Sequence, residues 1–168
     1  NRIPNCANLV AQIATQEVSV TIRVLVADDQ AMIRGALAGL LNLERDIEVV
    51  AQAADGVQAL EELARLATKD TQSAKPPTNS ARPDSPADVA IIDIEMPHMD
   101  GITTTEAIRA RFPGVRVLIV TTFGRPGYLQ RALDAGATGF MVKNAPVEAL
   151  AEGVRTLAAG GRAIDQSL

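Results

Sequence analysis

The chain has 168 residues, of which 47% are hydrophobic but only 2% aromatic, so any core must be built from aliphatic side chains. The formal net charge of −4 at pH 7 argues against a nucleic-acid-binding surface, because such surfaces are normally basic. A single cysteine excludes an internal disulfide and is typical of a reducing compartment.

The hydropathy pattern gives no indication of a membrane protein. Every apolar run falls short of the roughly 20 residues that cross a bilayer. The first residues also lack the basic segment and the apolar block of a secretory signal. We therefore expect a cytoplasmic protein with no membrane partner, in which residues 1–20 form an extension outside the fold.

From residue 21 to residue 160, five short apolar runs alternate with five helical patterns. The runs are rich in β-branched residues, which is typical of strands buried on both faces of a parallel sheet. The helical patterns repeat apolar residues at spacings of three and four. Strands are expected at 22–27, 47–53, 89–92, 115–121 and 138–142. Helices are expected at 31–42, 56–66, 102–112, 128–135 and 147–159.

This alternation predicts an α/β protein with the flavodoxin-like (βα)5 fold, a doubly wound parallel sheet of strand order 2-1-3-4-5. One segment interrupts the pattern. Residues 68–87 are rich in Pro, Ser, Thr, Asn and Asp and carry almost no large apolar side chains. They are expected to form an inserted mobile loop within a domain that spans residues 21–160.

The segment 89–101 organises the rest of the chain. Its apolar run stops at Asp93, which places a carboxylate at the carboxyl end of a central strand, where open α/β sheets bind their ligands. Asp28 and Asp29 follow the neighbouring strand, so three carboxylates should converge at one edge. Such a cluster repels itself unless a cation is present, and oxygen ligands suit Mg²⁺. A helix N-cap is the alternative role for Asp28 and Asp29, but a cap needs only one acid.

Two more strands end in side chains that suit a phosphate. The fourth strand closes with the hydroxyl of Thr121, and Lys143 follows the fifth strand. A lysine at a strand end is usually a solvated surface charge. Here it would be the cation nearest to the acidic cluster or to a phosphoryl group.

These pieces of sequence closely resemble the receiver domain of bacterial two-component response regulators. The resemblance covers about residues 21–160, apart from the insertion. The matching segments are VLVADDQ (24–30), IIDIEMPHMDG (91–101), VLIVTTF (117–123) and GATGFMVK (136–143).

The resemblance implies a role for each site residue. The phosphoacceptor is Asp93, which takes its phosphoryl group from a sensor histidine kinase. The implied Mg²⁺ ligands are Asp28, Asp29, Asp93 and the backbone carbonyl of Glu95. The implied phosphate-binding and switch residues are Thr121, Lys143 and Phe140. Such a domain catalyses its own phosphorylation and dephosphorylation, but it is a switch and not a turnover enzyme.

Two segments, 121–137 and 132–165, resemble the NarL/FixJ branch, whose receivers precede a LuxR-type helix-turn-helix domain. That branch implies that residues 161–168 begin a linker to a DNA-binding domain absent from this chain, and that DNA is bound only by that domain. It also implies a homodimer on phosphorylation. The helices at 31–42 and 147–159 are favoured as the contact face, and the helix at 128–135 with the fifth strand is the rival face.

Two other classes of function stay open at this point. A phosphatase of the haloacid-dehalogenase type also uses a strand-end Asp and Mg²⁺, but it resembles a pattern with a second Asp where this chain has Glu95. A structural dimerisation module would leave the acidic site unused. The single histidine, His98, is expected to be exposed and to be neither a phosphodonor nor a metal ligand.

Overall fold

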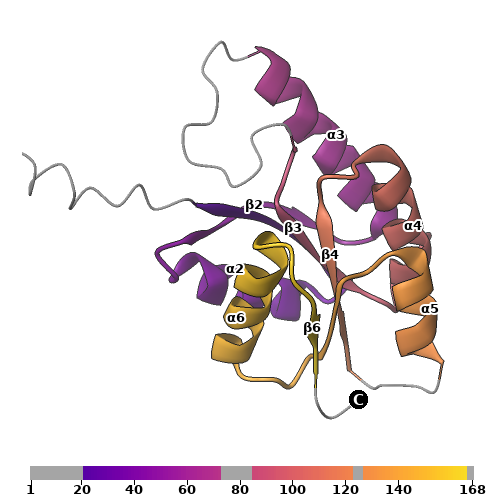
Figure 1. Ribbon diagram of the computed structural model, residues 1–168. Coiled ribbons are helices and arrows are strands. Elements are labelled where there is room, and N and C mark those ends of the chain that lie inside the picture. The colour runs from indigo at the N-terminus through magenta and orange to yellow at the C-terminus, as the bar shows by residue number, and fades with distance from the viewer. Residues whose placement is uncertain (1–20, 73–84, 123–126, 166–168) are drawn as a thin grey trace, which may run out of the picture.

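The computed structural model describes residues 21–72, 85–122 and 127–165 (Figure 1). The expected extension at 1–20 lies outside these ranges, as do the centre of the expected loop and the last three residues of the expected linker. Among the helices of the described part, none is both long enough and apolar enough to cross a membrane.

Six parallel strands form one sheet in the order β2-β1-β3-β4-β5-β6. This confirms the flavodoxin-like fold and its strand order, with one strand added at the edge. The strands are β1 (Ile22–Ala27), β2 (Ile47–Ala53), β3 (Val89–Asp93), β4 (Arg116–Thr121), β5 (Gly139–Val142) and β6 (Ala163–Ile164). The helices are α2 (Ala31–Asn42), α3 (Gly56–Gln72), α4 (Gly101–Arg111), α5 (Tyr128–Ala135) and α6 (Val147–Ala158).

Helices cover both faces of the sheet, with α2 and α6 on one side and α3, α4 and α5 on the other (Figure 1). Alternate residues of each strand therefore enter two separate cores. In β1, for example, Val24 and Val26 face the α2–α6 core, whereas Leu25 faces the α3–α5 core. All five residues of β3 are buried, as the unbroken apolar run predicts for a central strand.

The interpretation of residues 68–87 as a loop is corrected at both ends. Helix α3 continues to Gln72, and Ser85 and Ala87 are buried with 5% and 0% of their surface exposed. The guanidinium of Arg23 donates hydrogen bonds to the carbonyls of Ser85 and Pro86. The segment that leads into β3 is therefore anchored to β1. Composition did not reveal these ordered ends, because a polar helical turn and a segment held by hydrogen bonds need few apolar residues.

The expected linker also begins differently. Gly160 adopts a positive φ of 91°, which ends α6 and turns the chain back along the sheet. Residues of β6 then pair with β5. The Ala163 amide donates to the Thr138 carbonyl at 3.1 Å, and the Asp165 amide to the Phe140 carbonyl at 2.8 Å. A strand of two residues is too short to leave a pattern in the sequence.

Two apolar side chains that lie at the 3–4 spacing of their helices remain partly exposed. Leu40 of α2 is 42% exposed and Val57 of α3 is 39% exposed. The buried residues of α2 are Ala38 and Leu41. The 3–4 spacing identifies a helical stripe, but the neighbouring elements decide how much of that stripe is covered.

Candidate functional site

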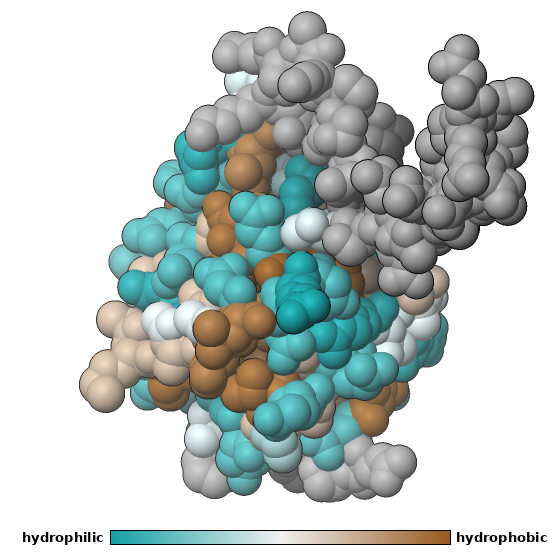
Figure 2. Space-filling view, turned by 90° about the vertical axis from the view of Figure 1, so that its left-hand side faces the viewer, coloured by the Kyte–Doolittle hydropathy of each residue, from teal (hydrophilic) through white to brown (hydrophobic). Residues whose placement is uncertain are grey.

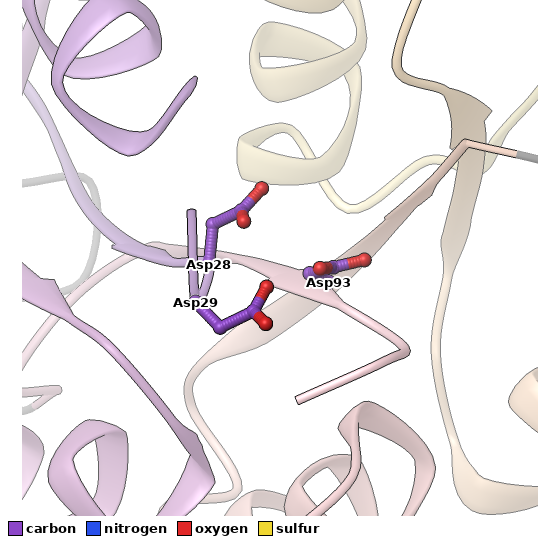
Figure 3. A group of neighbouring side chains, drawn as sticks. All are labelled: Asp28, Asp29 and Asp93. Carbon is purple, nitrogen blue, oxygen red and sulfur yellow. The ribbon is translucent and has the colours of Figure 1, made fainter. Parts of the chain in front are cut away.

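The carboxyl ends of β1 and β3 bring three acidic residues together (Figure 3). Ala27 pairs with Ile92, so the residues that follow these two positions lie next to each other at the same edge of the sheet. The side chains of Asp28, Asp29 and Asp93 each offer an oxygen atom, and these atoms lie within 4.8 Å of one another. The strand order predicted from the sequence is therefore sufficient to explain the cluster.

Lys143 neutralises part of this charge. Its Nζ lies 2.8 Å from Oδ2 of Asp28 and 3.1 Å from Oδ2 of Asp93, and its side chain is only 10% exposed. Burial alone would lower the pKa of Lys143, but the hydrogen bonds to the two carboxylates and their negative charges together outweigh burial and raise that pKa. The lysine is thus held in its charged form between the two acids.

The pKa of the Asp93 carboxyl group is shifted by its surroundings. Burial raises its pKa to about 6, from an ordinary value of 3.8. The contact with Lys143 opposes this change, whereas the charges of Asp28 and Asp29 add to it. A further cation beside Asp93 would favour its ionised, nucleophilic form.

The two neighbouring acids occupy different environments. Asp28 is 2% exposed, and both of its carboxylate oxygens have protein partners: Oδ1 accepts from the Gln30 amide at 2.9 Å, and Oδ2 contacts Lys143. Asp29 is exposed and lines a cavity of about 280 Å³. Asp29 is therefore the member of the pair that a ligand in the cavity meets first.

The structure places most of the other predicted site residues around the same cavity. Glu95, Thr121 and Lys143 all line it. Phe140 does not, because its side chain is fully buried in the α3–α5 core. Gln30 is a further lining residue that was not predicted, and its position directly after the acid pair is the only feature of the sequence that could have identified it.

His98 is exposed as expected, with 71% of its side chain accessible, but it has a partner that the sequence did not reveal. Its Nδ1 lies 3.0 Å from Oδ2 of Asp55, which is 43 residues away along the chain. Asp55 also caps α3, since its Oδ1 accepts from the Gln58 amide. That amide and then His98 lower the pKa of Asp55 against the opposing effect of burial. The loop after Asp93 is thereby tied to the start of α3.

Comparison with known proteins identifies the family. The response regulator receiver domain model matches residues 24–155. The transcriptional regulatory protein DesR of Bacillus subtilis (strain 168) is 38% identical over 141 residues, which are 84% of this chain and 60% of that protein. The uncharacterized transcriptional regulatory protein YvfU of the same strain is 36% identical over 147 residues, 88% of this chain and 64% of that protein. The chain thus spans about three fifths of the length of these relatives.

Solved structures agree with this assignment. The signal receiver domain of the response regulator NarL from Mycobacterium tuberculosis is 30% identical, with a TM-score of 0.68, over 83% of this chain and 98% of that domain. A LuxR-family two-component response regulator from Aurantimonas sp. SI85-9A1 is 26% identical, with a TM-score of 0.70. The chain belongs to the response regulator receiver domain family, and its relatives are regulators of the NarL and LuxR type.

Proposed function

We propose that this chain is a phosphorylation switch that takes a phosphoryl group from a partner histidine kinase onto Asp93 in the presence of Mg²⁺. The observation that carries the proposal is the convergence of Asp28, Asp29, Asp93 and Lys143 at one cavity on the sheet edge. The switch would control a C-terminal DNA-binding domain of a longer cytoplasmic protein, as the transcriptional regulatory relatives suggest. Family membership gives no support to the phosphatase alternative.

The donor set fits Mg²⁺, because carboxylate oxygens with room for water and phosphate oxygens are the ligands it prefers. Asp29, Asp93 and the Glu95 carbonyl would hold the ion at the cavity, with Asp28 behind them. Bound Mg²⁺ would supply positive charge that allows an anionic phosphoryl group to approach the three acids.

The chain's own residues account for the remaining chemistry. An ionised Asp93 oxygen attacks the phosphorus of the donor phosphohistidine, a new O–P bond forms, and the P–N bond breaks. The electron pair of that bond returns to the imidazole, which takes up a proton. Lys143 pairs with a phosphoryl oxygen as negative charge builds up. The Thr121 hydroxyl at the cavity wall would donate a hydrogen bond to an oxygen of the new phosphoryl group, and Phe140 would respond from the core beside it.

Intact-mass measurement tests the proposal directly. Incubation with acetyl phosphate and Mg²⁺ should add one phosphoryl group to the wild-type protein, none to Asp93→Asn, and none to the wild type in EDTA. Asp93→Asn keeps nearly the same shape, so its folding is a fair control, checked by circular dichroism. Equal phosphorylation of wild type and Asp93→Asn would refute the site. A wild type that never gains the group would instead support the dimerisation module.

Phosphorylation is further proposed to drive a homodimer through the α2–α6 face. Helix α2 and the residue after it expose an apolar surface, with Met32 88%, Leu40 42% and Leu43 79% accessible. Figure 2 views this side of the molecule and shows apolar side chains gathered there. A groove of about 220 Å³ lies beside them between α2 and α6. Apolar surface of this kind marks protein contacts. On the rival face, β6 already lies along the outer edge of β5.

Met32→Glu should therefore prevent the dimer that forms with beryllofluoride, a phosphoryl mimic, and Mg²⁺, because a charge would be buried at the contact. Light scattering would show wild type doubling in mass and Met32→Glu remaining a monomer. Arg131→Glu is the matched variant on the rival face, where Arg131 lies over the ring of Tyr128 at 5.8 Å. Loss of the dimer in Arg131→Glu alone would reverse the choice of face.

A further inference from the structure

The turn that carries Asp28 and Asp29 gains little from the capping of the helix that follows it. Helix α2 begins after Gln30, whose side chain makes no capping hydrogen bond, and its first turn contains no acidic residue. Gly35 follows within the helix, and a glycine in a helix interior weakens it. The position of the acid pair must therefore depend on other contacts.

Arg34 supplies such a contact. Its side chain is half-buried and reaches back past the start of α2, where Nη1 donates a hydrogen bond of 2.7 Å to the main-chain carbonyl of Asp28, six residues earlier. Its backbone amide donates to the Gln30 carbonyl at 2.9 Å, so both ends of the residue hold the same turn. On the other side, the Asp28 amide donates to the Ala53 carbonyl of β2 at 3.0 Å.

This hydrogen bond constrains Asp29 more than Asp28. The carbonyl of Asp28 and the amide nitrogen of Asp29 belong to one peptide unit, which is planar and stiff. A fixed carbonyl direction therefore fixes the orientation of this peptide plane, in which the Cα of Asp29 also lies. Asp28 has other anchors in Gln30 and Lys143, whereas Asp29 projects into the cavity from this plane.

We propose that Arg34 is a positioning residue that sets the affinity of the site for Mg²⁺ through the orientation of Asp29. The inference rests on the proposed function of this site. Mg²⁺ demands nearly ideal octahedral geometry, so a small rotation of one ligand costs affinity. Groups that orient a ligand from behind typically account for a tenfold to hundredfold difference in metal affinity. Arg34 is not placed against the reacting atoms, and the rate at saturating Mg²⁺ should depend on it little.

The experiment compares Arg34→Met, which keeps an apolar stem and removes the donors, with Arg34→Lys, which keeps one ammonium donor. Initial rates of phosphorylation by acetyl phosphate are followed by intact mass over a range of Mg²⁺ concentrations, and Mg²⁺ binding is measured by calorimetry. Arg34→Met should raise the half-saturating Mg²⁺ concentration about tenfold and leave the saturated rate within about twofold. Arg34→Lys should recover part of the affinity.

Arg155→Met is the matched control. Its guanidinium makes hydrogen bonds of 2.8 Å to Asp46 and Glu44, away from the cavity, so its loss tests general destabilisation. The half-saturating Mg²⁺ concentration should be unchanged in this variant. An unchanged value in folded Arg34→Met, or an equal rise in Arg155→Met, would overturn the inference.

The outcomes also separate this inference from the proposed function. If the wild type binds Mg²⁺ but gains no phosphoryl group, the proposed function fails, and weaker Mg²⁺ binding by Arg34→Met would still support the role of Arg34. If the wild type binds no Mg²⁺, both fail. Should Arg34→Met not fold, Arg34→Gln, whose side chain is shorter, takes its place. Weaker Mg²⁺ binding by Arg34→Gln than by Arg34→Lys would then support the inference. Equal affinity in both would overturn it.

Discussion

Gly101→Ala should destabilise the protein by about 3 kcal/mol or more, at the upper end of what overpacking costs. A Cβ at this position would lie 2.2 Å from the Asp93 carbonyl oxygen and 2.9 Å from its carbonyl carbon. Both are backbone atoms at the end of a buried strand, so they cannot rotate away as a flexible side chain would. The Gly101 amide also donates to the Ile94 carbonyl at 2.8 Å, which closes the loop that carries Glu95. Urea unfolding monitored by circular dichroism measures the effect.

Gly39→Ala makes the same chemical change in open space and is the control. A Cβ at Gly39 in α2 meets nothing within 4 Å. Replacing a helical glycine there should stabilise the protein by about 0.5 to 1 kcal/mol. The two substitutions should therefore shift the urea midpoint in opposite directions. Wild-type stability in Gly101→Ala would contradict the close packing of α4 against the backbone of Asp93.

Lys143→Met should lower the free energy of unfolding by about 3 kcal/mol in EDTA, because removing the lysine leaves buried carboxylate charge without a compensating cation. The carboxylates of Asp28 and Asp93 are 2% and 7% exposed, and Lys143 is the cation in contact with both. Adding Asp93→Asn to Lys143→Met should recover much of the loss, since a neutral amide removes the repulsion. A double-mutant cycle at pH 7.5 would give the coupling energy between Lys143 and Asp93. If Asp93→Asn left the cost of Lys143→Met unchanged, the lysine would not stabilise the protein through Asp93.

The pH dependence of the same variants has a defined sign. Asp93 has a pKa of about 6 in the folded protein, above its ordinary value of 3.8, so the folded state binds the proton more tightly than the unfolded state. Ionised Asp93 therefore lowers the free energy of unfolding above pH 6, and this destabilisation disappears as the pH falls from about 6 to about 4. Because Lys143 opposes the rise in this pKa, Lys143→Met should gain more stability over that interval than the wild type. Asp93→Asn should remove this part of the pH dependence of unfolding. A profile of stability against pH that is the same in Asp93→Asn and wild type would contradict the raised pKa of Asp93.

The sequence by itself determined the sheet and the position of the acidic cluster. Apolar runs and the polar residues that end them are local features, and the parallel strand order follows from their alternation with helices. Once β1 and β3 are neighbours, Asp28, Asp29 and Asp93 must meet, because the carboxyl ends of parallel strands share one edge. Lys143 follows from the same reasoning applied to β5.

Tertiary structure alone decided how these residues are held. The contact of His98 with Asp55 joins positions 43 residues apart, and no local pattern encodes it. The two-residue strand β6 exists only because β5 offers an edge with which it can pair. The reach of Arg34 back to the Asp28 carbonyl depends on where α2 sits against the sheet. Spacing and composition specify which residues can form an element, but the final contacts are set by packing between elements that are distant in the chain.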